Sequence, residues 1–359
     1  MLAGTSPTGN ISALRSADGI HWLPAAENPV IPSHPDCPMS LHRAADGRYV
    51  VYTRPEGGDR RVARAESWDF IHWSEVKLVL EPGPQDPPGI QFYGMGSTLY
   101  GGYELGTLWI YHTAPEDLSY YKTMGGRQEP ELAYCRNGSS WGWPLLSGAG
   151  GYSWHRAAPG EPLIPLGGAA DEWDWGRVQP ASGMVFLEDE IRIYYAGTKT
   201  PHGVKDWDRP EPRCGIGLAS LKPDRFVSLS AAGEGELLTR PLKTDTPEFY
   251  VNAAVEAGGY LRVEVADIGA KPIAGFELDN CLPIAGDSVR HRVQWWGNPS
   301  AASLAGPWIR LRVKAARARL YALFCCREEE LGQYWKFRIP HTRASLWEKL
   351  PVFDAAAAP

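Results

Sequence analysis

Two similar stretches, SADGIHW at residues 16–22 and SWDFIHW at residues 67–73, decide the fold class of this chain. In each, an Asp stands at the third place and a Trp closes the stretch at the seventh place. Asp and Asn tolerate a left-handed backbone and bond their own backbone, so the pattern predicts a tight turn between two strands. CRNGSSW at residues 135–141 is a third copy, and LKPDRFVSL at residues 221–229 is a looser one.

Strand-like segments with alternating polarity lie between these turns, which predicts a repeated strand, turn, strand, loop, strand unit. The central strands are GRYVVYTR (47–54), GTLWIYHT (106–113) and DEIRIYYAG (189–197). Each follows one of MSLHRA (39–44), FYGMGSTLY (92–100) and QPASGMVFL (179–187), and each precedes one of RRVARAES (60–67), PELAYCRN (130–137) and CGIGLASL (214–221). A four-stranded propeller blade takes about 40–50 residues. The pattern therefore predicts three full blades and a partial one at the start, with each Trp covering the gap between neighbouring sheets.

The turn pattern stops near residue 228, although strand-like alternation continues to residue 326. We therefore predict a β-propeller over residues 1–227, a β-sandwich over residues 228–326 and a C-terminal extension over residues 327–359. The fold class is all-β, and the 39 Gly and 31 Pro residues suit a turn-rich structure.

Composition excludes several classes of protein. The net charge of the 359-residue chain is −6 and no basic run occurs, which argues against a nucleic-acid partner. No apolar stretch approaches the length of a membrane span, and the first residues lack the pattern of a signal peptide, so we expect a cytoplasmic location. The six Cys residues have no CxxC spacing and no pair of His residues has metal-ligand spacing. We therefore predict no metal and no cofactor.

The 15 Trp and 16 Tyr residues outnumber the 9 Phe residues. Trp and Tyr combine an apolar ring with a hydrogen-bonding edge, as the binding of a sugar ring requires. Packing of Trp between β-sheets explains the same composition equally well.

Taken together, these residues resemble the five-bladed β-propeller glycoside hydrolases of families 32, 43, 68 and 117 and an unclassified bacterial group usually labelled family 32-like. The similarity covers most of residues 12–326 and is densest in residues 85–112, 172–197 and 261–297. It implies a five-bladed propeller, a β-sandwich and a carbohydrate substrate. The motifs W-x-N-D-P-N-G and R-D-P of family 32 are absent, so a fructosidase is not supported residue by residue. In such families the first blade carries the nucleophile or base; here that blade is either divergent or missing from the chain.

One carboxylate precedes the first strand of each recognised blade: Asp36, Asp86 and Asp174. Glycoside hydrolysis needs two carboxylates beside the scissile bond, and a third can tune the acid. As a hypothesis, Asp36 is the nucleophile or base, Asp86 the tuning group and Asp174 the acid, with Glu172 as the alternative acid. The competing interpretation is that each Asp only forms a turn.

Substrate-binding candidates flank these acids. Tyr93, Trp173 and Trp175 are placed to stack on a sugar ring, and Arg177 and His202 to contact its hydroxyl groups. His202 lies in a long polar loop, residues 198–212, a type of segment that is often functional. Packing between blades for the aromatic residues, and a plain surface position for His202, are the alternatives.

The sequence thus predicts a glycoside hydrolase that uses carboxylate acid/base chemistry at the propeller axis. The alternative is a carbohydrate-binding propeller that has lost hydrolysis, and a third hypothesis is a propeller that serves as a protein-interaction platform. The sugar, the linkage, the stereochemical outcome and the oligomeric state do not follow from the sequence.

Overall fold

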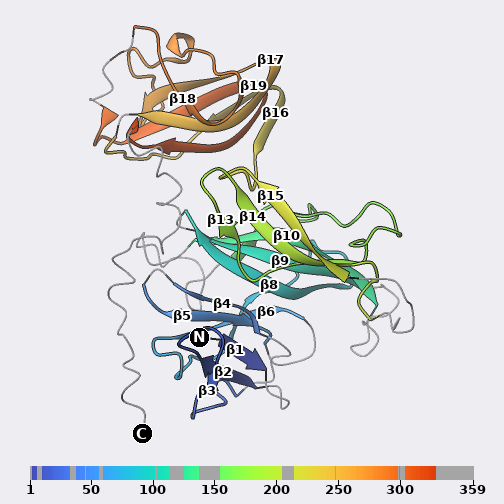
Figure 1. Cartoon of the computed structure of the whole chain (residues 1–359). Helices are drawn as coiled ribbons and strands as arrows, with labels where there is room; N and C mark the ends of the chain where they lie inside the picture. The colour runs from blue at the N-terminus through green and yellow to red at the C-terminus, as the bar shows by residue number, and fades with distance from the viewer. Residues whose placement is uncertain are drawn as a thin grey trace. The chain divides into compact units, whose positions relative to one another are not determined.

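The computed structural model describes residues 2–5, 10–32, 38–44, 46–55, 60–101, 103–113, 125–136, 154–203, 214–246, 248–297, 299 and 304–328. Within these ranges the chain forms β-strands and no α-helix, with a short 3-10 turn η2 (Leu278–Asn280) (Figure 1). The prediction of an all-β fold is confirmed. The chain divides into two compact units, one of residues 1–186 and 192–220 and another of residues 187–191 and 221–335, as far as those residues are described.

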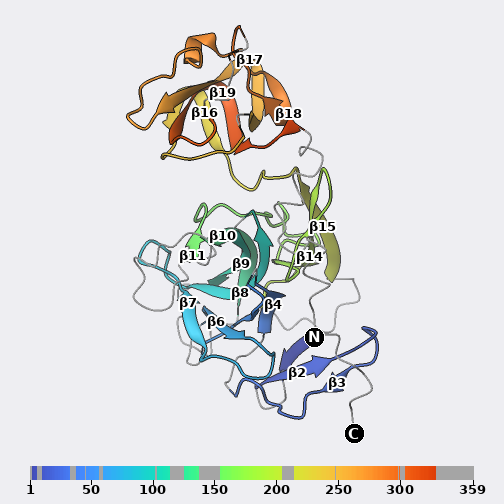
Figure 2. The same cartoon turned by 90° about the vertical axis from the view of Figure 1, so that its left-hand side faces the viewer.

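Three arrays of strands build the first unit. Two are small sheets with their strands in chain order: β1 (Leu2–Thr5), β2 (Ile11–Arg15) and β3 (Leu23–Pro24), then β4 (Pro38–Arg43), β5 (Tyr49–Thr53), β6 (Val62–Ser67) and β7 (Lys77–Leu80). Figure 2 shows β4, β6 and β7 in blue beside the teal strands of the third array. The strand, turn, strand, loop, strand unit predicted over residues 39–67 is therefore present.

Both faces of the second sheet are buried. Successive residues of a strand point to opposite faces, so neighbouring residues of β5 enter two different cores. Val50 and Tyr52 pack with Phe92 and Leu108 of the third array. Val51, between them in sequence, instead joins a core formed with the first sheet, whose members are Ile11, Ala13, Val30, Ile31, Ala65 and Phe70. Full burial of one such aliphatic side chain contributes roughly 1.5–3 kcal/mol. Consecutive sheets are thus held face to face by apolar contacts.

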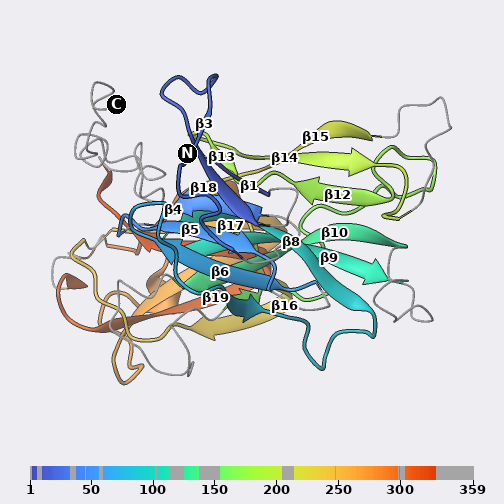
Figure 3. The same cartoon turned by 90° about the horizontal axis from the view of Figure 1, so that it is seen from below.

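The third array has eight strands. Six run in the order β13-β14-β12-β10-β9-β8, β11 pairs with β10, and β15 pairs with β14. Their bounds are β8 (Ile90–Tyr100), β9 (Tyr103–Thr113), β10 (Gly126–Arg136), β11 (Trp154–Arg156), β12 (Arg177–Pro180), β13 (Val185–Phe186), β14 (Ile191–Thr198) and β15 (Cys214–Leu221). Figure 3 shows β9, β10, β12, β14 and β15 following one another across this array. The contact between β10 and β12 is parallel and rests on the pair Gln128 and Arg177.

The repeated Trp turns have the local chemistry that the sequence predicts. Asp18 Oδ1 accepts the backbone N–H groups of residues 20 and 21, and Asp18 Oδ2 lies 2.6 Å from His21 Nδ1. Asp69 makes the same contacts with residues 71 and 72 in the second copy. These hydrogen bonds hold the pKa of each Asp carboxyl well below its usual range, with the His side chain as the largest cause.

The Trp that ends each turn stabilises the turn itself. Trp22 Nε1 donates to the Gly19 carbonyl at 3.1 Å, and Trp73 Nε1 donates to the Phe70 carbonyl at 3.0 Å. Trp73 also packs against the core between the first two sheets, whereas Trp22 is 37% exposed. The predicted cover between sheets is therefore seen for the second copy. The third copy lies outside the described residues beyond Arg136.

The second unit contains a four-stranded antiparallel sheet in the order β16-β19-β17-β18. The strands are β16 (Leu229–Leu238), β17 (Phe249–Asp267), β18 (Gly286–Arg292) and β19 (Ile309–Cys325), shown in yellow to red in Figure 1. One core packs along it, with Leu261, Val263, Trp295 and Leu311 among its buried members. The domain limits at residues 227 and 326, the sandwich and the count of five blades stay predictions.

Candidate functional site

Strand register brings polar residues into one row at the end of the third array. Gln91 of β8 lies opposite Tyr111 of β9, and Tyr111 lies opposite Gln128 of β10. Gln128 pairs with Arg177 of β12, which lies opposite Thr198 of β14. Directly opposed residues share a face of a sheet. Five strands therefore contribute side chains to one side of this edge.

Around this row we define the basic aromatic cluster by the residues Arg54, Arg60, Tyr93, Tyr111, Gln128, Arg177 and His202. His202 joins the Tyr residues, because its Nε2 lies 3.0 Å from Tyr93 Oη and its Nδ1 lies 3.3 Å from Tyr111 Oη. The backbone of His202 exchanges hydrogen bonds with Gly126, at the start of β10, which fixes the position of the imidazole. Two of the predicted substrate-binding residues, Tyr93 and His202, thus meet.

Guanidinium groups cover the rings of this cluster. Arg54 lies 4.7 Å from the ring centre of Tyr93 and donates to the Tyr93 carbonyl at 2.9 Å. Arg60 lies 5.3 Å from the ring of Tyr93 and 5.2 Å from that of Tyr111. Arg177 donates from Nε to Thr198 Oγ1 at 2.8 Å. Cations over aromatic faces are attracted by the ring quadrupole. The rings and the guanidinium groups therefore support one another.

Amide groups close the cluster on the side of β10 and β12. Gln179 Nε2 donates to Gln128 Oε1 at 2.5 Å, and the Gln128 side chain is fully buried. Gln128 Nε2 has no hydrogen-bond partner among the residues that the structure describes, and neither has the buried Nε1 of Trp109. Trp109 stacks on Tyr93 with ring centres 6.4 Å apart. Its indole also packs closely on Gly94 of β8, where an added Cβ atom would lie 2.7 Å from the ring. Buried donors without acceptors are costly unless a ligand or water satisfies them.

Burial changes the acidity of two members of the cluster. It raises the pKa of Tyr111 to about 12, so the phenol is neutral and able to donate at ordinary pH. Burial also lowers the pKa of the Arg177 guanidinium. The groups that oppose this effect at Arg177 are Tyr93, Cys214 and Tyr111, and no described carboxylate is among them.

Asp86, predicted as a tuning group, lies in a buried ion-pair network. Arg156 Nη1 donates to Asp86, and its Nε and Nη2 donate to the two oxygens of Glu131 at 2.6 and 2.7 Å. The three side chains are 5–8% exposed. Asp86 Oδ2 also accepts the N–H of Gly83 at 2.8 Å. The strong partner of Asp86 is thus a guanidinium, and both of its oxygens are engaged.

Asp174 has a different partner. Tyr195 Oη donates to Asp174 Oδ2 at 3.0 Å, and burial together with this carboxylate raises the pKa of Tyr195 to about 12. Trp173 stacks on Tyr195 with ring centres 5.7 Å apart and is 40% exposed. Glu172 is exposed, and its Oε2 accepts the N–H of Gly168 at 3.0 Å. The structure thus gives Asp86 and Asp174 separate partners.

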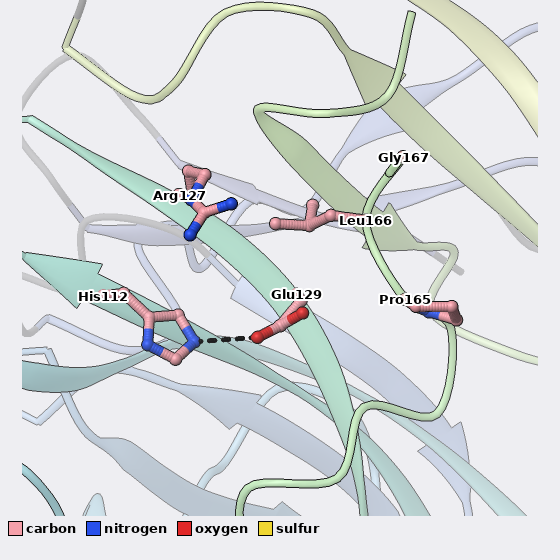
Figure 4. Close-up of a pocket in the computed structure, with 6 residues that line it drawn as sticks. All are labelled: His112, Arg127, Glu129, Pro165, Leu166 and Gly167. Carbon is pink, nitrogen blue, oxygen red and sulfur yellow. Dashed lines mark ion pairs between the residues drawn. The ribbon is translucent and has the colours of Figure 1, made fainter. Parts of the chain in front are cut away.

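A pocket of about 270 Å³ is lined by His112, Arg127, Glu129, Pro165, Leu166 and Gly167 (Figure 4). Figure 4 shows Arg127 and Glu129 projecting from one strand, β10, with the chain through Leu166 and Gly167 facing them, and Glu129 Oε1 lies 3.1 Å from His112 Nε2. A Cβ at Gly167 would lie 2.7 Å from Asp174 Oδ1 and from Glu172 Oε2. The pocket wall at Gly167 is therefore backed by two of the predicted acids.

Residues 172–177 contribute to both places. Glu172 and Asp174 adjoin the pocket wall at Gly167. The guanidinium of Arg127, which lines the pocket, lies 5.2 Å from the ring centre of Trp175. Two residues later, Arg177 joins the basic aromatic cluster. Of the predicted site residues, Glu172, Trp175 and Asp174 thus border the pocket, and Tyr93, Arg177 and His202 form the cluster.

A buried relay of Ser97, His42 and Glu104 was not anticipated. Ser97 Oγ lies 2.9 Å from His42 Nδ1, and His42 Nε2 lies 3.2 Å from Glu104 Oε1. Arg64 Nη1 donates to Glu104 Oε2 at 2.9 Å. Ser97 and Glu104 are 4% and 2% exposed. A nucleophile must reach its substrate, so this burial favours a structural role for the relay.

Sequence reasoning missed Arg54, Arg60, Tyr111 and Gln128. They lie on or beside strands with ordinary alternation, and only the register across strands reveals that they share a site. Asp36, the predicted nucleophile or base, lies outside the described residues; β4 begins two residues after it, at Pro38.

The described part of the chain holds no group of three or more His, Cys, Asp or Glu side chains placed to bind a metal ion. Among its helices, none is long and apolar enough to cross a membrane. Among the described cysteines, Cys214, Cys281 and Cys325 are free thiols.

No protein-family model matches this chain, and no curated protein sequence matches it. Solved structures of carbohydrate-processing proteins are similar to it at low identity. An N-acetylgalactosamine deacetylase from F. plautii, in complex with blood group B trisaccharide, has a TM-score of 0.41 and 12% identity over 60% of this chain. This chain spans 65% of the length of that deacetylase chain.

Two glycoside hydrolases are similar over more of the chain. A GH32 beta-fructofuranosidase of Bombyx mori has a TM-score of 0.37 and 10% identity, over 90% of this chain and 75% of that one. A family 117 glycoside hydrolase produced by Zobellia galactanivorans has a TM-score of 0.35 and 15% identity, over 78% and 84% of the two chains. At these values the similarity carries no conclusion about the activity of this chain.

Proposed function

We propose that this chain is a glycoside hydrolase that binds its sugar at the basic aromatic cluster. The observation that carries the proposal is the convergence of Tyr93, Tyr111 and His202 with the buried amide of Gln128 at one strand edge. Aromatic rings cover the apolar face of a sugar, while amide, imidazole and guanidinium groups bond its hydroxyls.

We assign hydrolysis to carboxylates that the sequence analysis singles out. Asp174 and Glu172 precede Arg177 of the cluster by a few residues, and Asp36 precedes β4. In the proposed reaction one carboxylic acid protonates the leaving oxygen, and a carboxylate attacks the anomeric carbon or activates water. Asp174, 9% exposed and bonded to Tyr195, is the proposed acid, and Asp36 the proposed nucleophile or base.

A second candidate function is carbohydrate binding without hydrolysis. The contacts of Asp86 favour it, because both oxygens of this carboxylate are already engaged, one by Arg156 and the other by the N–H of Gly83. A binding propeller needs the cluster and does not need the acids.

Aryl glycosides of arabinose, fructose, galactose, xylose and glucose, in furanoside and pyranoside forms, separate the two functions. A hydrolase releases the aryl alcohol, and Asp174→Asn and Asp36→Asn then abolish turnover with little change in melting temperature. Asp171→Asn, at an exposed neighbour of Glu172, is the matched control and keeps its rate. Sugar binding by calorimetry without turnover would replace hydrolysis by the binding function, and wild-type rates in both variants would refute the assigned acids.

A further inference from the structure

The cation at Arg177 is the feature of the cluster that a neutral sugar leaves unexplained. Arg177 is half-buried on β12, and its Nε donates a hydrogen bond to Thr198 Oγ1. This bond leaves the two terminal nitrogens of the guanidinium without a partner among the described residues. A buried charge without a counter-ion is costly, and proteins normally supply a carboxylate partner.

No described carboxylate is among the groups that act on Arg177. Gln128, its register partner on β10, has a buried Nε2 donor that meets no acceptor among the described residues. The neighbouring hydroxyls of Tyr93 and Tyr111 already contact His202. Burial lowers the pKa of the guanidinium itself, as expected where no anion compensates it. A site with an excess of donors is complementary to a ligand that brings negatively charged oxygens.

Because Nε of Arg177 is held by Thr198, the edge of the guanidinium that stays available to a ligand is determined. Nη1 and Nη2 remain, and two parallel N–H groups match the two oxygens of a carboxylate. Arg156 in the same unit shows that pairing with Glu131, through its Nε and Nη2. An aromatic surface beside such a group suits a sugar ring that carries the carboxylate.

We propose that the basic aromatic cluster recognises an acidic sugar, a hexuronic acid or its glycoside, and that the sugar carboxylate binds Arg177. This inference deepens the proposed function and rests on the cluster being the sugar site. In the complex, the carboxylate accepts from the terminal nitrogens of Arg177, and the sugar ring lies beside Tyr93. The net charge of the buried site is then close to balanced.

Calorimetry on the full chain tests the proposal with D-glucuronate and D-galacturonate against D-glucose and D-galactose. The expected result is at least tenfold tighter binding of one uronate than of its neutral counterpart. Arg177→Gln abolishes this preference, and Arg177→Lys, which keeps the charge and loses the planar fork, retains part of it. Arg43→Gln is the matched control, because Arg43 donates to the Gly47 carbonyl and lies over Tyr49, away from the cluster.

The outcomes separate this inference from the function on which it rests. Equal binding of uronates and neutral sugars overturns the acidic ligand and leaves the carbohydrate site standing. Unchanged uronate binding in Arg177→Gln overturns the role of Arg177. Inorganic sulfate that competes as well as glucuronate at equal concentration overturns the assignment to a carboxylate. If no sugar binds and no aryl glycoside is cleaved, both proposals fall. Melting curves of the variants show that each is folded.

Discussion

Arg156 and Arg177 are two half-buried arginines of the first unit, and their surroundings are opposite. Arg156 at the end of β11 meets Asp86 and both oxygens of Glu131. Arg177 at the start of β12 meets a Thr hydroxyl, two Tyr residues and a Cys. The ion pairs raise the pKa of Arg156 against its burial, whereas burial lowers the pKa of Arg177.

The difference separates a cation that the chain itself neutralises from one that it leaves open. A guanidinium with two buried carboxylates satisfies its own charge and stabilises the fold around it. A half-buried guanidinium without a carboxylate partner destabilises the fold. Proteins retain such an arrangement where a ligand supplies the missing anion. The same residue type is therefore held by its own ion pairs at one position, and at the other we propose it as a binding group.

Arg156→Gln is expected to give the largest effect. It leaves Asp86 and Glu131 buried without their cation, and breaking a buried pair in this way costs about 3–5 kcal/mol. In a domain of 150–250 residues this lowers the melting temperature by roughly 6–20 °C. Thermal and urea unfolding measure it, with Arg43→Gln as the control. A loss below about 1 kcal/mol would remove Arg156 from the structural side of the comparison.

Asp86→Asn and Glu131→Gln are expected to cost less than Arg156→Gln, about 1–3 kcal/mol each, because Arg156 keeps one carboxylate. Adding Asp86→Asn to the Arg156→Gln variant then recovers part of the lost stability, because it removes one of the two buried carboxylates left without their cation. Additive losses in this cycle would contradict the coupling. A full loss of turnover in Asp86→Asn with unchanged melting would instead favour the catalytic tuning role.

Arg177→Gln is expected to change the free energy of unfolding by no more than about 1 kcal/mol, and in the stabilising direction, because it removes a charge without a partner. Urea unfolding without sugar measures this change. A loss comparable with that of Arg156→Gln would show that Arg177 has a structural counter-ion, which would argue against the acidic ligand.

The smallest effect concerns Tyr111. Burial raises the pKa of its phenol to about 12. The unfolded phenol titrates near 10. Between these values the native state holds a proton that the unfolded state has lost, so stability is present below about pH 10 and falls as the pH rises toward 12. Tyrosinate absorbance, with Tyr111→Phe as the reference, isolates this titration. Arg177→Gln is expected to raise the pKa of Tyr111 further, because the guanidinium favours the tyrosinate. An unchanged pKa of Tyr111 in this variant would show that Arg177 lies too far away to affect the phenol.

The sequence by itself determined the local structure of the first unit. The S-x-D pattern at residues 16–22 and 67–73 encodes its own turn, because Asp oxygens and backbone N–H groups two or three residues apart find each other in any context. Alternating segments likewise predicted β5, β6, β9 and β14 close to their observed bounds. Both signals depend on neighbours in the chain, which the sequence displays directly.

Only the tertiary structure decided which side chains form a site. Tyr93 and His202 are 109 residues apart, and Asp86 and Arg156 are 70 apart. Carboxylates at equivalent blade positions were expected to share one environment. Instead, Asp86 pairs with the guanidinium of Arg156, and Asp174 accepts a hydrogen bond from the phenol of Tyr195. The parallel contact of Gln128 with Arg177, which collects the cluster, depends on how β10 meets β12. Such register follows from packing between sheets, and no pattern within either strand records it.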